Sequence, residues 1–72
     1  MSAAHATAAL IAASLRDAIA RGDYQPGARL PSILRLSEAH DANLTTAARA
    51  LRLLADSGHV VHVAGKGWFA PR

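Results

Sequence analysis

Residues 32–58, SILRLSEAHDANLTTAARALRLLADSG, decide the fold of this 72-residue chain. Two segments with apolar residues at helical spacing flank a three-residue turn at 41–43. This arrangement is the outline of a helix-turn-helix. Asn43 is a candidate N-cap for the second helix, and Gly58 supplies a stop after it. The stretch therefore predicts a first helix of about two turns and a second helix over about 43–57.

The second helix of this pair has two contrasting sides. At about 100° per residue, one side is apolar and faces a core. The opposite side carries hydroxyl, guanidinium and carboxyl groups that can enter a groove of DNA. The apolar side consists of Ala47, Ala50, Leu51 and Leu54, and the polar side of Thr45, Arg49, Arg52 and Asp56.

Composition limits the partners and the compartment. Eight Lys and Arg against five Asp and Glu give a formal charge of +3, which favours an anionic partner if the charges cluster. There is no cysteine, which excludes disulfides and cysteine zinc sites and fits a reducing cytoplasm. No segment approaches the roughly 18 apolar residues that span a bilayer. We therefore expect a cytoplasmic protein without membrane contact.

The flanking segments supply one more helix and a hairpin. An apolar stripe over 8–21 predicts a first helix, and Pro26-Gly27 is a strong turn signal. Residues 28–30 form a short strand candidate that can add to a sheet edge. Val-rich residues 60–63 and Trp68-Phe69 predict a β-hairpin around a glycine-containing loop.

The predicted order of elements is helix, strand, helix, helix, strand, strand. A hairpin directly after the second helix of a helix-turn-helix makes a winged helix. We therefore expect a mainly α fold with a small β-hairpin, of the α+β class, in one domain over 1–72. A domain of this size buries only about 60% of its unfolded surface, so its core must be small and dense.

The motif G-x-Y-x-P-G-x-x-L-P-S, at residues 22–32, is the most specific signal in the sequence. With this motif and the pattern around it, the chain resembles the N-terminal winged-helix domain of the GntR family of bacterial transcription regulators. The other matching positions are Leu15-Arg16, Ile19, Leu36, Thr45-Thr46, Ala50-Leu51, Leu54, Gly58, Val60, Gly65, Gly67 and Phe69.

The resemblance implies an operator-binding module of a transcription regulator, which we expect to be a repressor. In such a module the helix over about 43–57 enters the major groove, and the wing over about 60–70 touches the neighbouring backbone or minor groove. The implied partner is double-stranded DNA. A homodimer, or fusion to an effector-binding domain, is expected to supply further affinity, because one module covers only about 600–1,000 Å² on DNA.

Nine residues are candidates for DNA contact. Asn43, Thr45 and Thr46 match family positions at the helix start, where free N–H groups and the helix dipole suit a phosphate. Arg49 and Arg52 follow one and two turns later and can reach a base edge or the backbone. The remaining candidates are the wing-tip residues Gly65 and Lys66, and Arg29 and Arg35, which would add phosphate contacts with Lys66.

Several of these residues also have ordinary structural interpretations. Arg52 can pair with Asp56 at i, i+4 on a solvated helix face. Asn43 can act only as a cap, and Lys66 can simply keep a turn soluble. Trp68 is expected to cover the edge of the core rather than stack on a partner.

Departures from the family pattern support an alternative function. Ile33-Leu34 stand where the family has Glu-Arg, and Leu44 and Ala48 stand where it has arginines. Val61 and Val63 are apolar at hairpin positions that are often polar or basic. If these residues form one exposed patch, the domain has exchanged DNA reading for protein binding.

No constellation in the sequence predicts catalysis or a metal site. Ser-His-Asp spacing, paired carboxylates and a phosphate loop are all missing. His59 and His62 would point to opposite faces of a strand, and no cysteine completes a site. We therefore expect neither an enzyme nor a bound cofactor.

Overall fold

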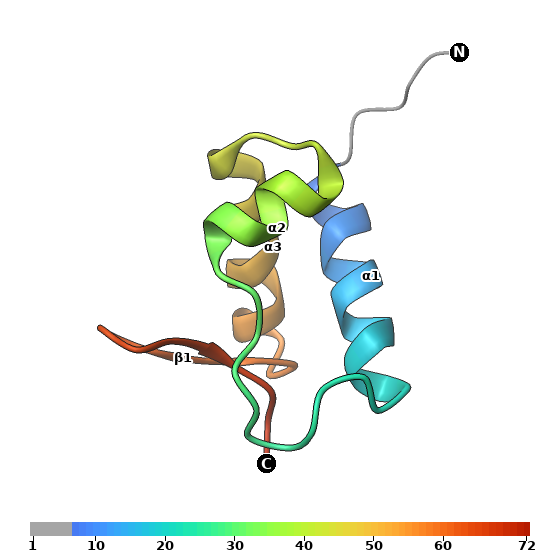
Figure 1. The fold of residues 1–72 in the computed structure, drawn as a ribbon, viewed down its shortest axis with the longest axis vertical. Coiled ribbons are helices and arrows are strands. Elements are labelled where there is room, and N and C mark those ends of the chain that lie inside the picture. The colour runs from blue at the N-terminus through green and yellow to red at the C-terminus, as the bar shows by residue number, and fades with distance from the viewer. Residues whose placement is uncertain (1–6) are drawn as a thin grey trace.

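Three helices and a two-stranded hairpin follow one another along residues 7–72, the part of the chain that the computed structural model describes (Figure 1). The hairpin projects sideways from the helices, on the side on which α2 begins and near the end of α3. The elements are α1 (Ala8–Ala20), α2 (Ile33–His40), α3 (Leu44–Asp56), β1 (Val61–Val63) and β2 (Gly67–Phe69).

Each helix begins at a polar side chain that caps it. The hydroxyl of Thr7 accepts from the N–H of Leu10 at 3.1 Å, at the start of α1. Ser32 caps α2 in the same way. The Oδ1 of Asn43 accepts from the N–H of Thr46 at 2.8 Å and caps α3, as predicted. These bonds satisfy N–H groups that have no partner within the helix.

The turn between α2 and α3 is tight because Asp41 adopts a left-handed conformation, with φ 51° and ψ 46°. The N–H of Ala42 then donates to the carbonyl of Ser37 at 2.9 Å, which closes the end of α2. Two residues after Asp41, Asn43 starts α3. The helix-turn-helix predicted from the sequence is confirmed.

The core lies where α3 packs against both α1 and α2. Ala47 and Ala50 of α3 are fully buried, and their small side chains leave room for larger ones from the neighbouring helices. Ile11 and Leu51 are the largest side chains that are fully enclosed. The complete core consists of Ile11, Ala12, Leu15, Leu30, Leu36, Ala47, Ala50, Leu51, Leu54, Val60 and Ala70.

The hairpin pairs β1 and β2 in an antiparallel register that matches His62 with Trp68. The predicted strand over 28–30 is reduced to a single bridge between Arg29 and Phe69, so the sheet has two strands. Backbone hydrogen bonds on both sides of that bridge, from Leu30 to Trp68 and from Ala70 to Ala28, are each 2.8 Å long. They tie the hairpin to the segment that leads into α2, and so fix the position of the wing relative to the helices.

Candidate nucleic-acid interface

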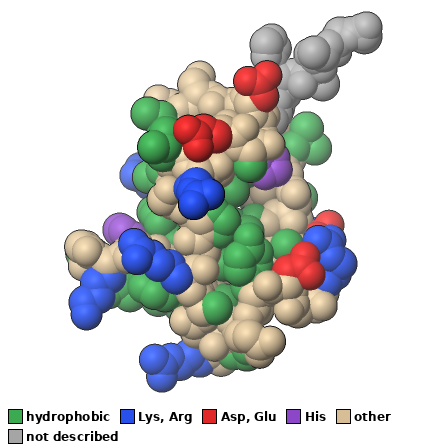
Figure 2. Space-filling model, in the orientation of Figure 1, with side chains coloured by type: hydrophobic (Ala, Val, Ile, Leu, Met, Phe, Trp, Pro, Cys, Tyr) green, Lys and Arg blue, Asp and Glu red, His purple; other side chains and the backbone are tan. Residues whose placement is uncertain are grey.

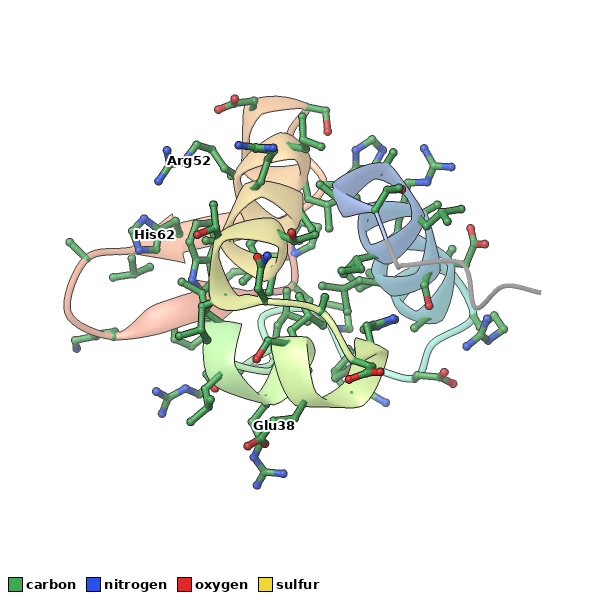
Figure 3. All side chains as sticks on the ribbon, turned by 90° about the horizontal axis from the view of Figure 1, so that it is seen from above. Glu38, Arg52 and His62 are labelled. Atoms are coloured by element: carbon green, nitrogen blue, oxygen red, sulfur yellow. The ribbon has the colours of Figure 1, made fainter. Side chains whose placement is uncertain are left out.

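One side of α3 faces the hairpin. Leu44, Ala48 and Arg52 follow one another at intervals of four residues, so they line the same side of the helix. Figure 3 shows that Arg52 extends from α3 on the side on which His62 leaves β1. His62 in turn lies against Trp68. We call these five residues the α3–hairpin face.

An aromatic stack forms the hairpin part of this face. The ring centroids of His62 and Trp68 are 4.0 Å apart, with 19° between the ring planes. Trp68 also packs against the core, as predicted, whereas His62 is exposed on top of it. The sequence pointed to His62 only as a possible metal ligand. The signal that was missed is positional: residues 62 and 68 lie equally far from Gly65 and therefore pair across the hairpin.

Basic side chains stand on and around the hairpin at the lower left of Figure 2, and others lie further up and at the right. The acidic side chains in this view lie at the top and at the right, away from the hairpin. Arg29 places its guanidinium group beside Gly67, within 3.5 Å of where a Cβ would stand. Lys66 is exposed at the hairpin tip, where Gly65 adopts a φ of 77°. Its side chain borders the face of the hairpin that carries Val61 and Val63, not the face with His62.

The other candidates on α3 are arranged around its first two turns. Thr45 and Arg49 are exposed and lie further round the helix from the hairpin than Ala48 does. Thr46 is half-buried, and its N–H group is already taken by Asn43. Thr45 and Arg49 therefore extend the α3–hairpin face outward, whereas Asn43 shapes it by fixing the helix start.

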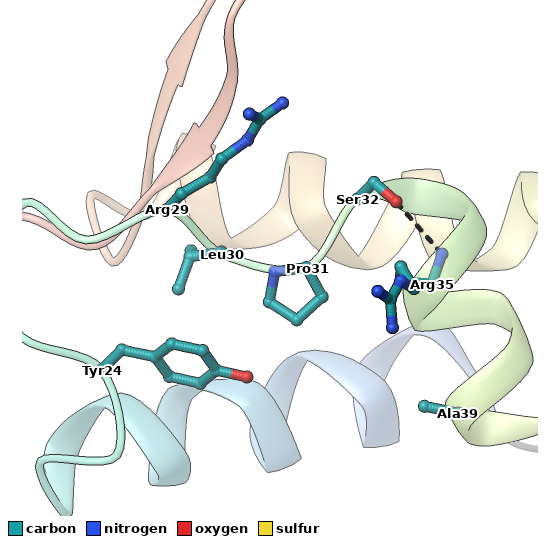
Figure 4. A pocket seen from close by; sticks show the side chains of 7 residues that line it. All are labelled: Tyr24, Arg29, Leu30, Pro31, Ser32, Arg35 and Ala39. Carbon is teal, nitrogen blue, oxygen red and sulfur yellow. Dashed lines mark hydrogen bonds between the residues drawn. The ribbon is translucent and has the colours of Figure 1, made fainter.

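Arg35 is separated from this face. It lines an open hollow of about 610 Å³ on the other flank of α2, together with Tyr24 and Ala39 (Figure 4). Leu34, the preceding residue, instead lines a hollow of about 290 Å³ that it shares with Gly67 and Trp68. The two neighbours point apart because adjacent residues on a helix differ by about 100°.

The alternative pairing of Arg52 with Asp56 is not formed. Within residues 7–72 the one ion pair joins Arg21 to Asp23 at 2.8 Å, and both side chains are largely exposed. The guanidinium groups of Arg49 and Arg52 thus have no carboxylate partner in this part of the chain. They are free for an external anion.

His59 and His62 do not share a strand, which corrects the geometry predicted for them. His59 lies in the bend before β1, and its Nδ1 is 2.8 Å from the hydroxyl of Ser57. His59 and His62 therefore do not point to opposite faces of one strand, because His59 lies outside the strand. Among the described residues, no three His, Asp or Glu side chains come together in a way that could hold a metal ion.

The apolar residues behind the protein-binding alternative do not form one patch. Val61 and Val63 line one face of the hairpin with Phe69, whereas Leu34 borders Trp68 on the other side. Ile33 packs against the core. Leu44 and Leu34 remain conspicuous, because 53% and 55% of their surface is exposed.

Residues 7–70 match the family described as bacterial regulatory proteins, gntR family. The chain belongs to the GntR family. Structures of family members confirm the winged-helix fold predicted from the sequence. Since the match covers nearly the whole chain, the domain is a GntR-family regulator domain. A search of curated protein sequences finds no match.

Three solved structures illustrate the similarity. YtrA from Sulfolobus acidocaldarius, a GntR-family transcription factor, is 31% identical with a TM-score of 0.81, over 90% of this chain and 68% of that one. A GntR-family regulator from Listeria monocytogenes is 26% identical with a TM-score of 0.84, over 89% of this chain and 56% of that one. The DNA-binding domain of AraR in complex with the operator ORR3 shares the fold, with 22% identity, a TM-score of 0.83, and coverage of 88% and 76%.

The GntR-family domain therefore spans about half to two thirds of the first two relatives. As for membranes, none of the helices within residues 7–72 is long and apolar enough to cross one.

Proposed function

We propose that this GntR-family domain binds double-stranded DNA in a sequence-specific manner, with α3 in the major groove and the hairpin on the adjacent backbone. The observation that carries the proposal is the side on which the hairpin projects. It is the side on which α2 begins and on which Arg52 and His62 extend from α3 and β1. A duplex laid against α3 there would also meet the wing.

The groups available on this side suit a polyanion. The N–H groups of Leu44 and Thr45 have no hydrogen-bond partner within residues 7–72, as expected at a helix start, so they can donate to a phosphate. Arg52 and Arg49 can add a phosphate contact or a bidentate bond to guanine. Lys66 at the tip and Arg29 beside Gly67 would follow the backbone on the wing side.

We infer that two copies act together as a transcription regulator, with repression the expected outcome. One module of this size covers only about 600–1,000 Å² on DNA, which limits its affinity. A two-fold pair would contact half-sites about one helical turn apart. The operator complex of the structurally similar AraR domain supports DNA as the partner.

The test is selection of bound duplexes from a random-sequence pool, followed by titration of a selected duplex at two salt concentrations. We expect affinity to fall steeply as salt rises, because bound phosphates release counterions. The combined variant Arg49→Gln, Arg52→Gln and Lys66→Gln should lose most of the binding. Affinity that ignores salt or survives this variant would contradict the proposal, and failure to enrich any duplex would favour the protein-binding alternative.

A further inference from the structure

We propose that Leu44 and Ala48 read thymine methyl groups in the major groove, which makes them specificity-determining residues. The inference rests on the proposed DNA-binding function and names what α3 would recognise. Leu44 is the first residue of α3 and is 53% exposed, on the side of the helix that faces the hairpin. Ala48 is half-buried one turn later on the same side.

The chemistry of these two side chains limits what they can recognise on a base edge. Arginine at such positions can donate two hydrogen bonds to guanine, whereas leucine and alanine have no polar atoms in their side chains. In the major groove the apolar group among the base edges is the C5-methyl of thymine. A leucine held against that methyl gains by burial, and against a guanine it leaves the O6 and N7 acceptors without a donor.

The surroundings favour DNA over a protein as the occupant. The exposed part of Leu44 lies at the helix start, beside the unpartnered N–H groups and Thr45, and Arg52 follows two turns further along the same side of α3. A protein interface needs a larger contiguous apolar surface than Leu44, Ala48 and Leu34 provide, because Val61 and Val63 lie on the other face of the hairpin. A mixture of donors, one guanidinium and a few methyl groups instead matches the major-groove edge of an A·T-containing site.

Leu34 extends the same preference to the start of α2. Its side chain is 55% exposed and borders the hollow that reaches Trp68. It lies beside the α3–hairpin face, so a duplex bound to that face would pass close to Leu34. Leu34 contributes apolar contact at the edge of the site, whereas Leu44 and Ala48 define its centre.

The experiment replaces thymine by deoxyuridine, which removes the C5-methyl and leaves base pairing intact. A duplex enriched from a random pool is synthesised with single thymine-to-uracil changes at every position, and each dissociation constant is measured with the chain. We expect one or two thymines in each half-site to matter, with binding about three- to fivefold weaker for each methyl lost. All other thymines should be replaceable without effect.

Variants connect the lost methyl to a residue. Leu44→Ala should weaken binding to the thymine duplex and abolish the difference between thymine and uracil at one of those positions. Leu10→Ala is the matched control, since Leu10 is 59% exposed but lies on α1. It should bind both duplexes as the unchanged chain does. Leu44→Arg should shift the preferred base at that position toward guanine in a repeated selection.

The outcomes separate the two levels of the proposal. If a duplex is enriched and bound in a salt-dependent way but uracil replaces every thymine without effect, the thymine inference is wrong and DNA binding stands. The thymine inference is also wrong if Leu44→Ala leaves the uracil effect unchanged. If no duplex is enriched, the proposed function itself fails. Circular dichroism of each variant confirms that a loss of binding is not a loss of fold.

Discussion

His62 and Trp68 face each other across the hairpin with their ring centroids 4.0 Å apart. Because Trp68 also packs against the core, this stack links the exposed wing to the interior of the domain. The stack should stabilise the folded state. In a double-mutant cycle with His62→Ala and Trp68→Ala, we expect a coupling free energy of about 0.2–1 kcal/mol from urea unfolding. Additive effects of the two changes would show that the rings only lie near each other.

Asn43 allows the observed cap and the proposed DNA contact to be tested separately. Asn43→Ala removes the bond to the N–H of Thr46 and should lower the free energy of unfolding by about 1 kcal/mol. Asn43→Asp keeps a capping oxygen, so stability should stay close to that of the unchanged chain. The added negative charge would meet DNA phosphates and should weaken DNA binding several-fold. Equal binding by the Asp variant would place Asn43 outside the interface.

Asp41 tests the turn of the helix-turn-helix. Its left-handed backbone, with φ at 51°, costs a non-glycine residue conformational energy. Asp41→Gly removes that cost and should raise the midpoint of thermal unfolding, by an amount that corresponds to up to about 1 kcal/mol. Asp41→Val, which is β-branched, should lower it. A glycine variant that is clearly less stable would mean that the aspartate side chain stabilises the turn through bonds of its own.

Two leucines in one helix give a matched test of the core. Leu51 is fully buried, whereas its near neighbour Leu53 is 46% exposed. Leu51→Ala should cost about 2–5 kcal/mol, enough to unfold much of a small domain, because it leaves a cavity between the helices. Leu53→Ala should change stability by less than about 0.5 kcal/mol. Comparable losses in chemical denaturation would show that α3 is rotated relative to the arrangement described above.

The local features of the fold could be predicted from the sequence because a few neighbouring residues determine them. The cap at Asn43, the turn at 41–43 and the buried stripe of α3 each depend on side chains within one or two helical turns. The strand expected at 28–30 depends instead on a partner near residue 69. Only one bridge forms there, and nothing in the segment itself shows how far pairing extends.

The candidate site was less predictable because it depends on which elements lie beside each other. The spacing of Arg52 and Asp56 permits a salt bridge, but long exposed side chains gain little from one, and it does not form. Arg35 was grouped with the other arginines, yet it faces the hollow near Tyr24 on the far flank of α2. The stacking of His62 on Trp68 depends on the register of the hairpin. That register is known only when the turn is placed around Gly65.

Arg52 provides a quantitative test of the proposal that the α3–hairpin face binds DNA. Because its guanidinium group has no carboxylate partner within residues 7–72 and points to the side of His62, neutralising it should remove about one phosphate contact or one guanine contact. If Arg52→Gln removes a phosphate contact, the slope of log affinity against log salt should fall by about one, with equal loss on all sequences. If it removes a base contact, discrimination at one position should fall by about 1–3 kcal/mol.

The control is Arg16→Gln, which replaces an exposed arginine on α1. It makes the same change in net charge and should alter neither quantity. Equal effects from both variants in fluorescence-anisotropy titrations would mean that only net charge drives binding and that α3 does not face the DNA.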